Sequence, residues 1–137
     1  MNRLVVDTSA WAAIADVSDD QHQVALAYQA KIAGRYRLVI TNYILDELYT
    51  LLLMNVGYTQ TINFKHRLDQ LIQCGFVEVI WVSESIAHQA WQVFEQFNKE
   101  AGFRFRPAMS YQTAIANGWN RKLCVTPCWS SFFHPMN

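Results

Sequence analysis

Residues 4–11 read Leu-Val-Val-Asp-Thr-Ser-Ala-Trp, and this stretch decides the fold. Its short apolar run is typical of a strand buried on both faces of a parallel sheet. Asp7 follows at once, and Asp, Thr and Ser are helix-capping residues, so we expect a short helix from here to about Ala15. Open α/β sheets place their ligand sites at the carboxyl ends of such strands. A carboxylate is costly to bury there unless a cation or hydrogen bonds compensate it, so Asp7 indicates a site for a metal ion or a phosphate.

Strands and helices alternate along the rest of the chain. Further strands are predicted at residues 37–40, 76–81 and 123–126, and helices at residues 21–33, 42–55, 59–73, 84–98 and 109–117. This alternation predicts an α/β fold, with a mainly parallel central sheet of four to five strands flanked by helices. We find no linker or repeat, so residues 1–137 are expected to form a single domain.

Capping and periodicity add local expectations. Thr41 and Ser83 each precede a predicted helix and are expected to cap it. The helix at 21–33 should end at Gly34 and bury its apolar face, which consists of Val24, Ala27, Tyr28 and Ile32.

Composition excludes several classes of protein. The chain is 52% hydrophobic and 16% charged, which is a globular composition. No apolar run approaches the roughly 18 residues of a membrane span, and no basic stretch leads into an apolar one at the start, so we expect no membrane association and no secretory signal. The three cysteines form no Cys-x-x-Cys pair, which argues against a structural zinc site or a disulfide framework. A cytoplasmic protein with reduced thiols is expected.

The charges are unevenly distributed, although the net charge is zero. The last 37 residues contain four basic residues, Arg104, Arg106, Arg121 and Lys122, and no acid. Such a segment is either an ordinary basic surface or one that contacts nucleic acid.

Glu47 is the second candidate site residue. The helical pattern places it on the apolar face of its helix, near Ile44 and Leu51, whereas Asp46 should be solvated. An inward acid is either a boundary residue whose carboxylate reaches water or a second carboxylate directed at the sheet edge where Asp7 lies. Two acids from separate elements suit Mg²⁺ or Mn²⁺, which prefer oxygen ligands. Thr8 and Ser9 are helix caps, or they orient Asp7 and bound water.

Three segments together resemble the PIN-domain family. They are residues 4–10, residues 41–52 (Thr-Asn-Tyr-Ile-Leu-Asp-Glu-Leu-Tyr-Thr-Leu-Leu) and residues 90–94 (Ala-Trp-Gln-Val-Phe), and the resemblance covers residues 1–98. It implies an Mg²⁺- or Mn²⁺-dependent ribonuclease that cleaves RNA phosphodiesters. Many bacterial members are toxins of toxin–antitoxin pairs, so a small antitoxin protein and a homodimer are further implied.

Carried over to this chain, the resemblance makes Asp7 and Glu47 the catalytic, metal-binding acids, with Thr8 and Ser9 supporting them. Arg104 and Arg106 are the expected RNA contacts. Residues 99–137 depart from the family pattern, because Pro107 stands where a third acid is expected and no acid follows Glu100.

Two explanations of this departure stay open. One is a change of reading frame near the end of the gene, since residues 130–135 in a shifted frame can encode a family-like ending. The other is a diverged, catalytically inactive domain that acts by binding RNA or protein. A phosphotransfer fold is a minor alternative, but Ser9 stands where a haloacid-dehalogenase-type domain has its second Asp.

Overall fold

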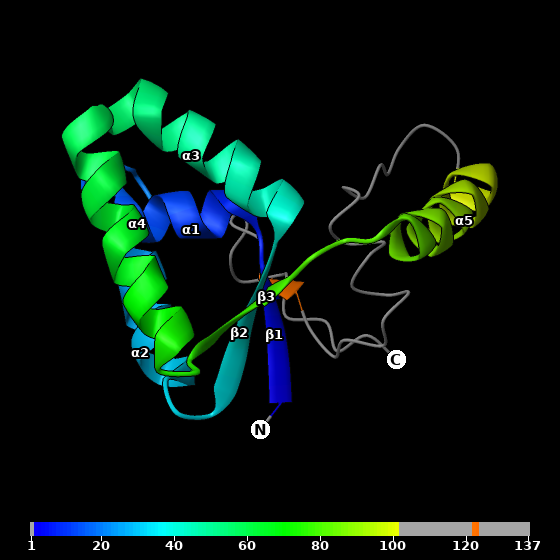
Figure 1. Cartoon of the computed structure of the whole chain (residues 1–137), viewed down its shortest axis with the longest axis horizontal. Coiled ribbons are helices and arrows are strands. Elements are labelled where there is room, and N and C mark those ends of the chain that lie inside the picture. Colours follow the sequence, from blue (N-terminus) through cyan, green and yellow to red (C-terminus); the bar gives the residue numbers. More distant parts are fainter. Residues whose placement is uncertain (1, 102–121, 124–137) are drawn as a thin grey trace.

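Four strands form the central sheet of the computed structural model, which describes residues 2–101 and 122–123 (Figure 1). The strands are β1 (Asn2–Val6), β2 (Tyr36–Thr41), β3 (Val77–Ile80) and β4 (Lys122–Leu123). Their order across the sheet is β3-β2-β1-β4, and every neighbouring pair is parallel. The predicted parallel α/β fold is confirmed.

The described part of the chain contains five helices. They are α1 (Thr8–Ala15), α2 (His22–Ile32), α3 (Asn42–Val56), α4 (Tyr58–Gln73) and α5 (Glu84–Ala101). From β1 to β3 the chain advances in one direction across the sheet, and it then returns to place β4 beyond β1. Right-handed crossovers therefore place α1 to α4 on one face and α5 on the other, as Figure 1 shows.

The core lies around β1 and β2, because each of these strands has a neighbour on both sides. Leu4, Val5 and Val6 are fully buried, as the apolar run predicts. On the face of the first four helices, Trp11 of α1 packs edge-on against Phe64 of α4. Asp7 therefore sits at the end of a buried central strand.

Both predicted caps are confirmed. The Ile44 amide donates to Thr41 Oγ1 at 3.2 Å, and the Ile86 amide donates to Ser83 Oγ at 3.3 Å. A short polar side chain thus starts each helix: Thr41 is the last residue of β2, and Ser83 follows the end of β3 by three residues. The result fixes where α3 rises from the carboxyl edge of β2.

The buried face of α2 differs from the prediction. Ile32 is buried, but Val24 is 46% exposed and Ala27 is also exposed. The reason is that α2 packs mainly against α1, to which it is joined by a 2.7 Å hydrogen bond between buried His22 Nδ1 and the Ala13 carbonyl oxygen. The narrow contact buries His22, Ala25 and Ile32 in place of the wider apolar arc.

Some sequence predictions fall outside the described residues. The helix at 109–117 lies there entirely, as does most of the strand at 123–126, of which only Leu123 is described, in β4. None of the described helices is long and apolar enough to span a membrane.

Tyr49 gives the fold a pH dependence at high pH. Two causes raise the pKa of the Tyr49 phenol from 10.0 to about 12. The larger is its burial on α3, and the smaller is the negative charge of Asp69. Because the folded pKa is the higher one, this stabilisation is complete below pH 10 and is lost as the pH rises towards 12. Urea unfolding at several pH values should therefore show a smaller loss of stability over this range for Tyr49→Phe than for wild type. Tyr58→Phe, at an exposed tyrosine, is the control; an equal pH dependence in all three proteins would contradict the assignment.

Candidate functional site

Asp7 connects β1 to α1 at the carboxyl edge of the sheet. Its backbone is extended, and its carbonyl oxygen accepts hydrogen bonds from the amides of Ala10 and Trp11, both at 3.1 Å. Its carboxylate Oδ1 accepts from the Thr8 amide at 2.9 Å. The side chain is half-buried. The strand end and the first turn of α1 thus hold this carboxylate in place, where the positive end of the helix favours a negative charge.

Glu47 is brought to the same edge by α3. The Thr8 hydroxyl, on a residue that is only 4% exposed, donates to Glu47 Oε2 at 3.0 Å. Thr8 therefore joins Asp7, its neighbour in the chain, to a carboxylate 39 residues away in sequence. The structure places Asp7, Thr8 and Glu47 together at one point.

The expected inward position of Glu47 is wrong. Glu47 is exposed, as is Asp46, which was expected to be solvated. The buried stripe of α3 consists of Ile44, Leu48 and Leu52, each one turn from the next. Leu48 follows Glu47 by about 100° around the helix, so Glu47 lies beside that stripe and not within it. Its carboxylate is nevertheless held at the sheet edge by Thr8.

The oxygen atoms of this cluster fit a hard divalent cation. Mg²⁺ is commonly bound through one or two carboxylates together with phosphate oxygens and water, not by a cage made wholly of protein. The site has two carboxylates, and Glu47 is open to solvent. Within the described residues, no group of three or more His, Cys, Asp or Glu side chains could hold a metal ion. Any ion here would therefore depend on Asp7 and Glu47 and on oxygens from water or substrate.

Asn42 is a residue of this edge that the sequence analysis did not single out. It is the first residue of α3, and its Oδ1 accepts from the Val82 amide at 2.7 Å. This bond ties the end of β2 to the segment between β3 and α5, so the loops around the site are fixed to one another. The sequence signal that could have identified Asn42 is its position directly after Thr41, the residue expected to cap the helix.

Of the other predicted site residues, only Ser9 lies within the described part of the chain. Ser9 lies in the first turn of α1 and is half-buried. Arg104 and Arg106, the expected RNA contacts, lie outside the described residues, as does Pro107.

Comparison with known proteins extends the sequence resemblance. The sequence model of the PIN domain family matches residues 4–122, so the match continues past residue 98, where the sequence resemblance ends. No curated protein gives a significant match. Two crystal structures have similar folds at low sequence identity, and at these identities they show a shared fold and no more.

The first of these is Mycobacterium tuberculosis VapC20, described as a sarcin–ricin loop cleaving toxin. Its TM-score is 0.68 at 22% identity, over 94% of this chain and 95% of the other. The second is VapBC2 from Rickettsia felis, bound to a DNA fragment from their promoter. Its TM-score is 0.61 at 14% identity, over 96% of this chain and 93% of the other.

Proposed function

Because this chain belongs to the PIN-domain family, we propose that it is an Mg²⁺- or Mn²⁺-dependent ribonuclease and the toxin of a toxin–antitoxin pair. The proposal covers residues 1–137 as one domain. The similar folds of VapC20, a toxin that cleaves the sarcin–ricin loop, and of VapBC2 support it. A small antitoxin protein and a second copy of this chain are the proposed protein partners.

One observation carries the proposal: the hydrogen bond from Thr8 to Glu47, which brings the second acid to the strand end that presents Asp7. In the proposed site these two carboxylates hold the divalent ion. When bound, such an ion supplies activation of water and neutralisation of the charge that develops on a phosphodiester.

The chain's own residues give this site its geometry. The Thr8 amide and the first turn of α1 hold Asp7, while the Thr8 hydroxyl orients Glu47. Ser9 is proposed to orient Asp7 or bound water from the same turn. Arg104 and Arg106 are proposed to attract the RNA backbone, since phosphate contacts by Arg supply most of the affinity that does not depend on sequence.

Thr8 offers a test that leaves both carboxylates in place. The purified protein is expected to cleave RNA in Mg²⁺ or Mn²⁺, with a fragment carrying the sarcin–ricin loop as one substrate, and EDTA should stop cleavage. Thr8→Val keeps the size of this buried side chain but removes the donor to Glu47. It should raise the metal concentration needed for half-maximal cleavage by about tenfold, the usual cost of losing a group that orients a metal ligand.

Thr8→Ser keeps the hydroxyl and is the matched control, expected to stay close to wild type. If Thr8→Val and wild type need the same metal concentration, the hydrogen bond does not position a metal ligand. If the wild-type protein cleaves no RNA in either metal, the ribonuclease proposal fails.

A second candidate function is binding without hydrolysis. The observation that favours it is the absence of any acid after Glu100, which leaves Asp7 and Glu47 without the third acid that family members place later in the chain. Fewer carboxylates give weaker ion binding because less negative charge balances the ion. This function predicts RNA or antitoxin binding with no cleavage and no measurable metal binding at Asp7.

A further inference from the structure

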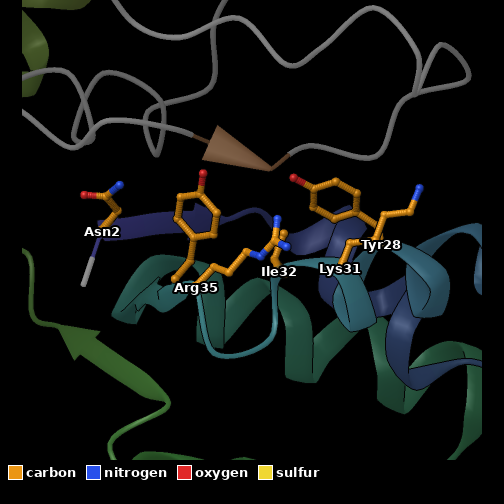
Figure 2. A pocket seen from close by; sticks show the side chains of 6 residues that line it. Asn2, Tyr28, Lys31, Ile32 and Arg35 are labelled. Carbon is orange, nitrogen blue, oxygen red and sulfur yellow. The ribbon is translucent and has the colours of Figure 1, made fainter.

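A pocket of about 340 Å³ lies at the opposite edge of the sheet from Asp7 and Glu47. It is lined by Asn2, Tyr28, Lys31, Ile32, Arg35 and Tyr36 (Figure 2). Asn2 and Tyr36 are register partners at the amino ends of β1 and β2. Asn2 precedes Asp7 by five residues along β1, which corresponds to about 16 Å of strand. The pocket is therefore separate from the carboxylate site.

The pocket is built from fixed parts of the fold. Tyr28, Lys31 and Ile32 lie within one turn of one another on α2, and Ile32 is buried. Gly34 then takes a positive φ of 75°, a conformation that favours glycine, and so turns the chain after α2. The Arg35 amide donates to the Ile32 carbonyl oxygen at 3.0 Å, which fixes the turn. In Figure 2 the Arg35 side chain lies between Asn2 on one side and Tyr28 and Lys31 on the other.

The pocket is positively charged. Lys31 and Arg35 line it, and none of the described residues that line it is acidic. Both cations are exposed, and neither makes an ion pair with any other residue that the structure describes. Among the other described residues, Arg3 forms an ion pair with Glu78, and Lys65 forms one with Asp69. Two unpaired cations at one opening favour a ligand with negative charge.

The aromatic rings narrow the class of ligand. Tyr28 and Tyr36 line the pocket beside the two cations, and both rings are half-buried. Cations combined with aromatic rings are the means by which proteins bind single-stranded nucleic acid, with phosphates at the cations and bases or sugars against the rings. An acidic peptide would use the cations but would not need the rings. A pocket of this volume is also within the range of small-ligand sites, which begins near 300 Å³.

We propose that this pocket binds one nucleotide of an RNA strand, with its phosphate at Lys31 and Arg35 and its base or ribose against Tyr28 or Tyr36. The inference rests on the proposed function for its choice of RNA, and it adds a contact remote from the reacting phosphodiester. At about 3.4 Å per nucleotide of stacked strand, a span of ~16 Å corresponds to about five nucleotides.

The experiment measures RNA binding without cleavage. A fluorescent single-stranded RNA of mixed sequence is titrated with full-length protein in EDTA, and anisotropy is recorded over a series of salt concentrations. The double variant Lys31→Gln/Arg35→Gln is expected to bind about tenfold more weakly, with a salt slope reduced by about 0.7, as the loss of one phosphate contact on a single strand requires. Tyr28→Leu should weaken binding at least fivefold without changing that slope, because stacking is not electrostatic.

Lys65→Gln/Arg67→Gln is the matched control, since it removes the same charge from α4. It should bind RNA like wild type, and circular dichroism melts should show all variants folded. Equal affinity and salt slope in the pocket double variant and this control would overturn the inference. So would a pocket double variant that loses binding to a poly-glutamate peptide but keeps RNA binding, which would assign the pocket to an acidic protein partner.

The outcomes separate this inference from the proposed function. A protein that binds RNA through Lys31 and Arg35 but cleaves none in Mg²⁺ or Mn²⁺ supports the pocket and contradicts the ribonuclease. If the protein cleaves RNA and the Lys31→Gln/Arg35→Gln variant binds RNA as tightly as wild type, the ribonuclease is supported and the pocket is contradicted.

Discussion

Replacing Asp7 by asparagine is expected to lower the rate of RNA cleavage by roughly a thousandfold, equivalent to about 4 kcal/mol of transition-state stabilisation. The substitution removes one of the two carboxylates in the proposed site and keeps the size of the side chain. Asparagine also caps helices about as well as aspartate, so the first turn of α1 should persist. The loss should therefore appear in the cleavage rate and not in the melting temperature. Single-turnover cleavage in Mn²⁺ measures it directly.

Asp46→Asn is the matched control for this prediction. Asp46 precedes Glu47 on α3 and is exposed, so its removal changes the net charge equally and close to the site. We expect cleavage by this variant to stay near the wild-type rate. If Asp7→Asn and Asp46→Asn slow cleavage to the same extent, the effect is one of general charge and Asp7 has no special role.

Replacing Leu48 by alanine is expected to cost about 3–4 kcal/mol of unfolding free energy. Leu48 is fully buried in the core on α3, between the buried residues Ile44 and Leu52. Its truncation leaves a cavity where α3 packs against α1. Since small domains have total stabilities of about 5–15 kcal/mol, this one change should remove a large part of the whole. Urea unfolding, followed by circular dichroism, gives the difference.

Leu53→Ala makes the same chemical change on the same helix at a side chain that is 51% exposed. Helix propensity changes equally in both variants, so the difference between them reports burial alone. The control should lose about 1 kcal/mol or less. Similar losses in the two variants would contradict the packing of α3 described above.

The main elements were predictable because their signals are local. An apolar run ending in Asp-Thr-Ser specifies a buried strand followed by a capped helix, and β1 and α1 follow this pattern. Thr41 marks the start of α3 in the same way. Such signals depend on neighbours in the chain, so they need no knowledge of what packs where.

Burial was less predictable, because it depends on contacts between elements. Val24 of α2 is exposed because α2 meets α1 along a narrow contact. Tryptophans show the same limit: Trp11 is buried in the core, whereas Trp81, at the end of β3, is 72% exposed. Trp11 comes shortly after the residues that cap α1, and Trp81 directly follows β3. Neither local pattern shows whether another element will pack over the tryptophan side chain.

The candidate sites illustrate both cases. Asp7 could be singled out from the sequence because a charge ends an apolar run. The link through Thr8 to Glu47 could not, since it joins residues 39 apart through a hydroxyl. The basic pocket could not be anticipated either, because parallel register places Tyr36 beside Asn2 and the turn at Gly34 carries Arg35 to the same place.

The most direct test of the central claim, that Asp7 and Glu47 together form a metal site, is calorimetric titration of Mn²⁺ into three proteins. These are the wild type, Asp7→Asn and Glu47→Gln, all with the full chain and without RNA. We predict one Mn²⁺ site per chain in the wild type and at least tenfold weaker binding in each variant, because either loss leaves a single carboxylate. Unchanged Mn²⁺ binding in both variants, or no binding by the wild type, would contradict it.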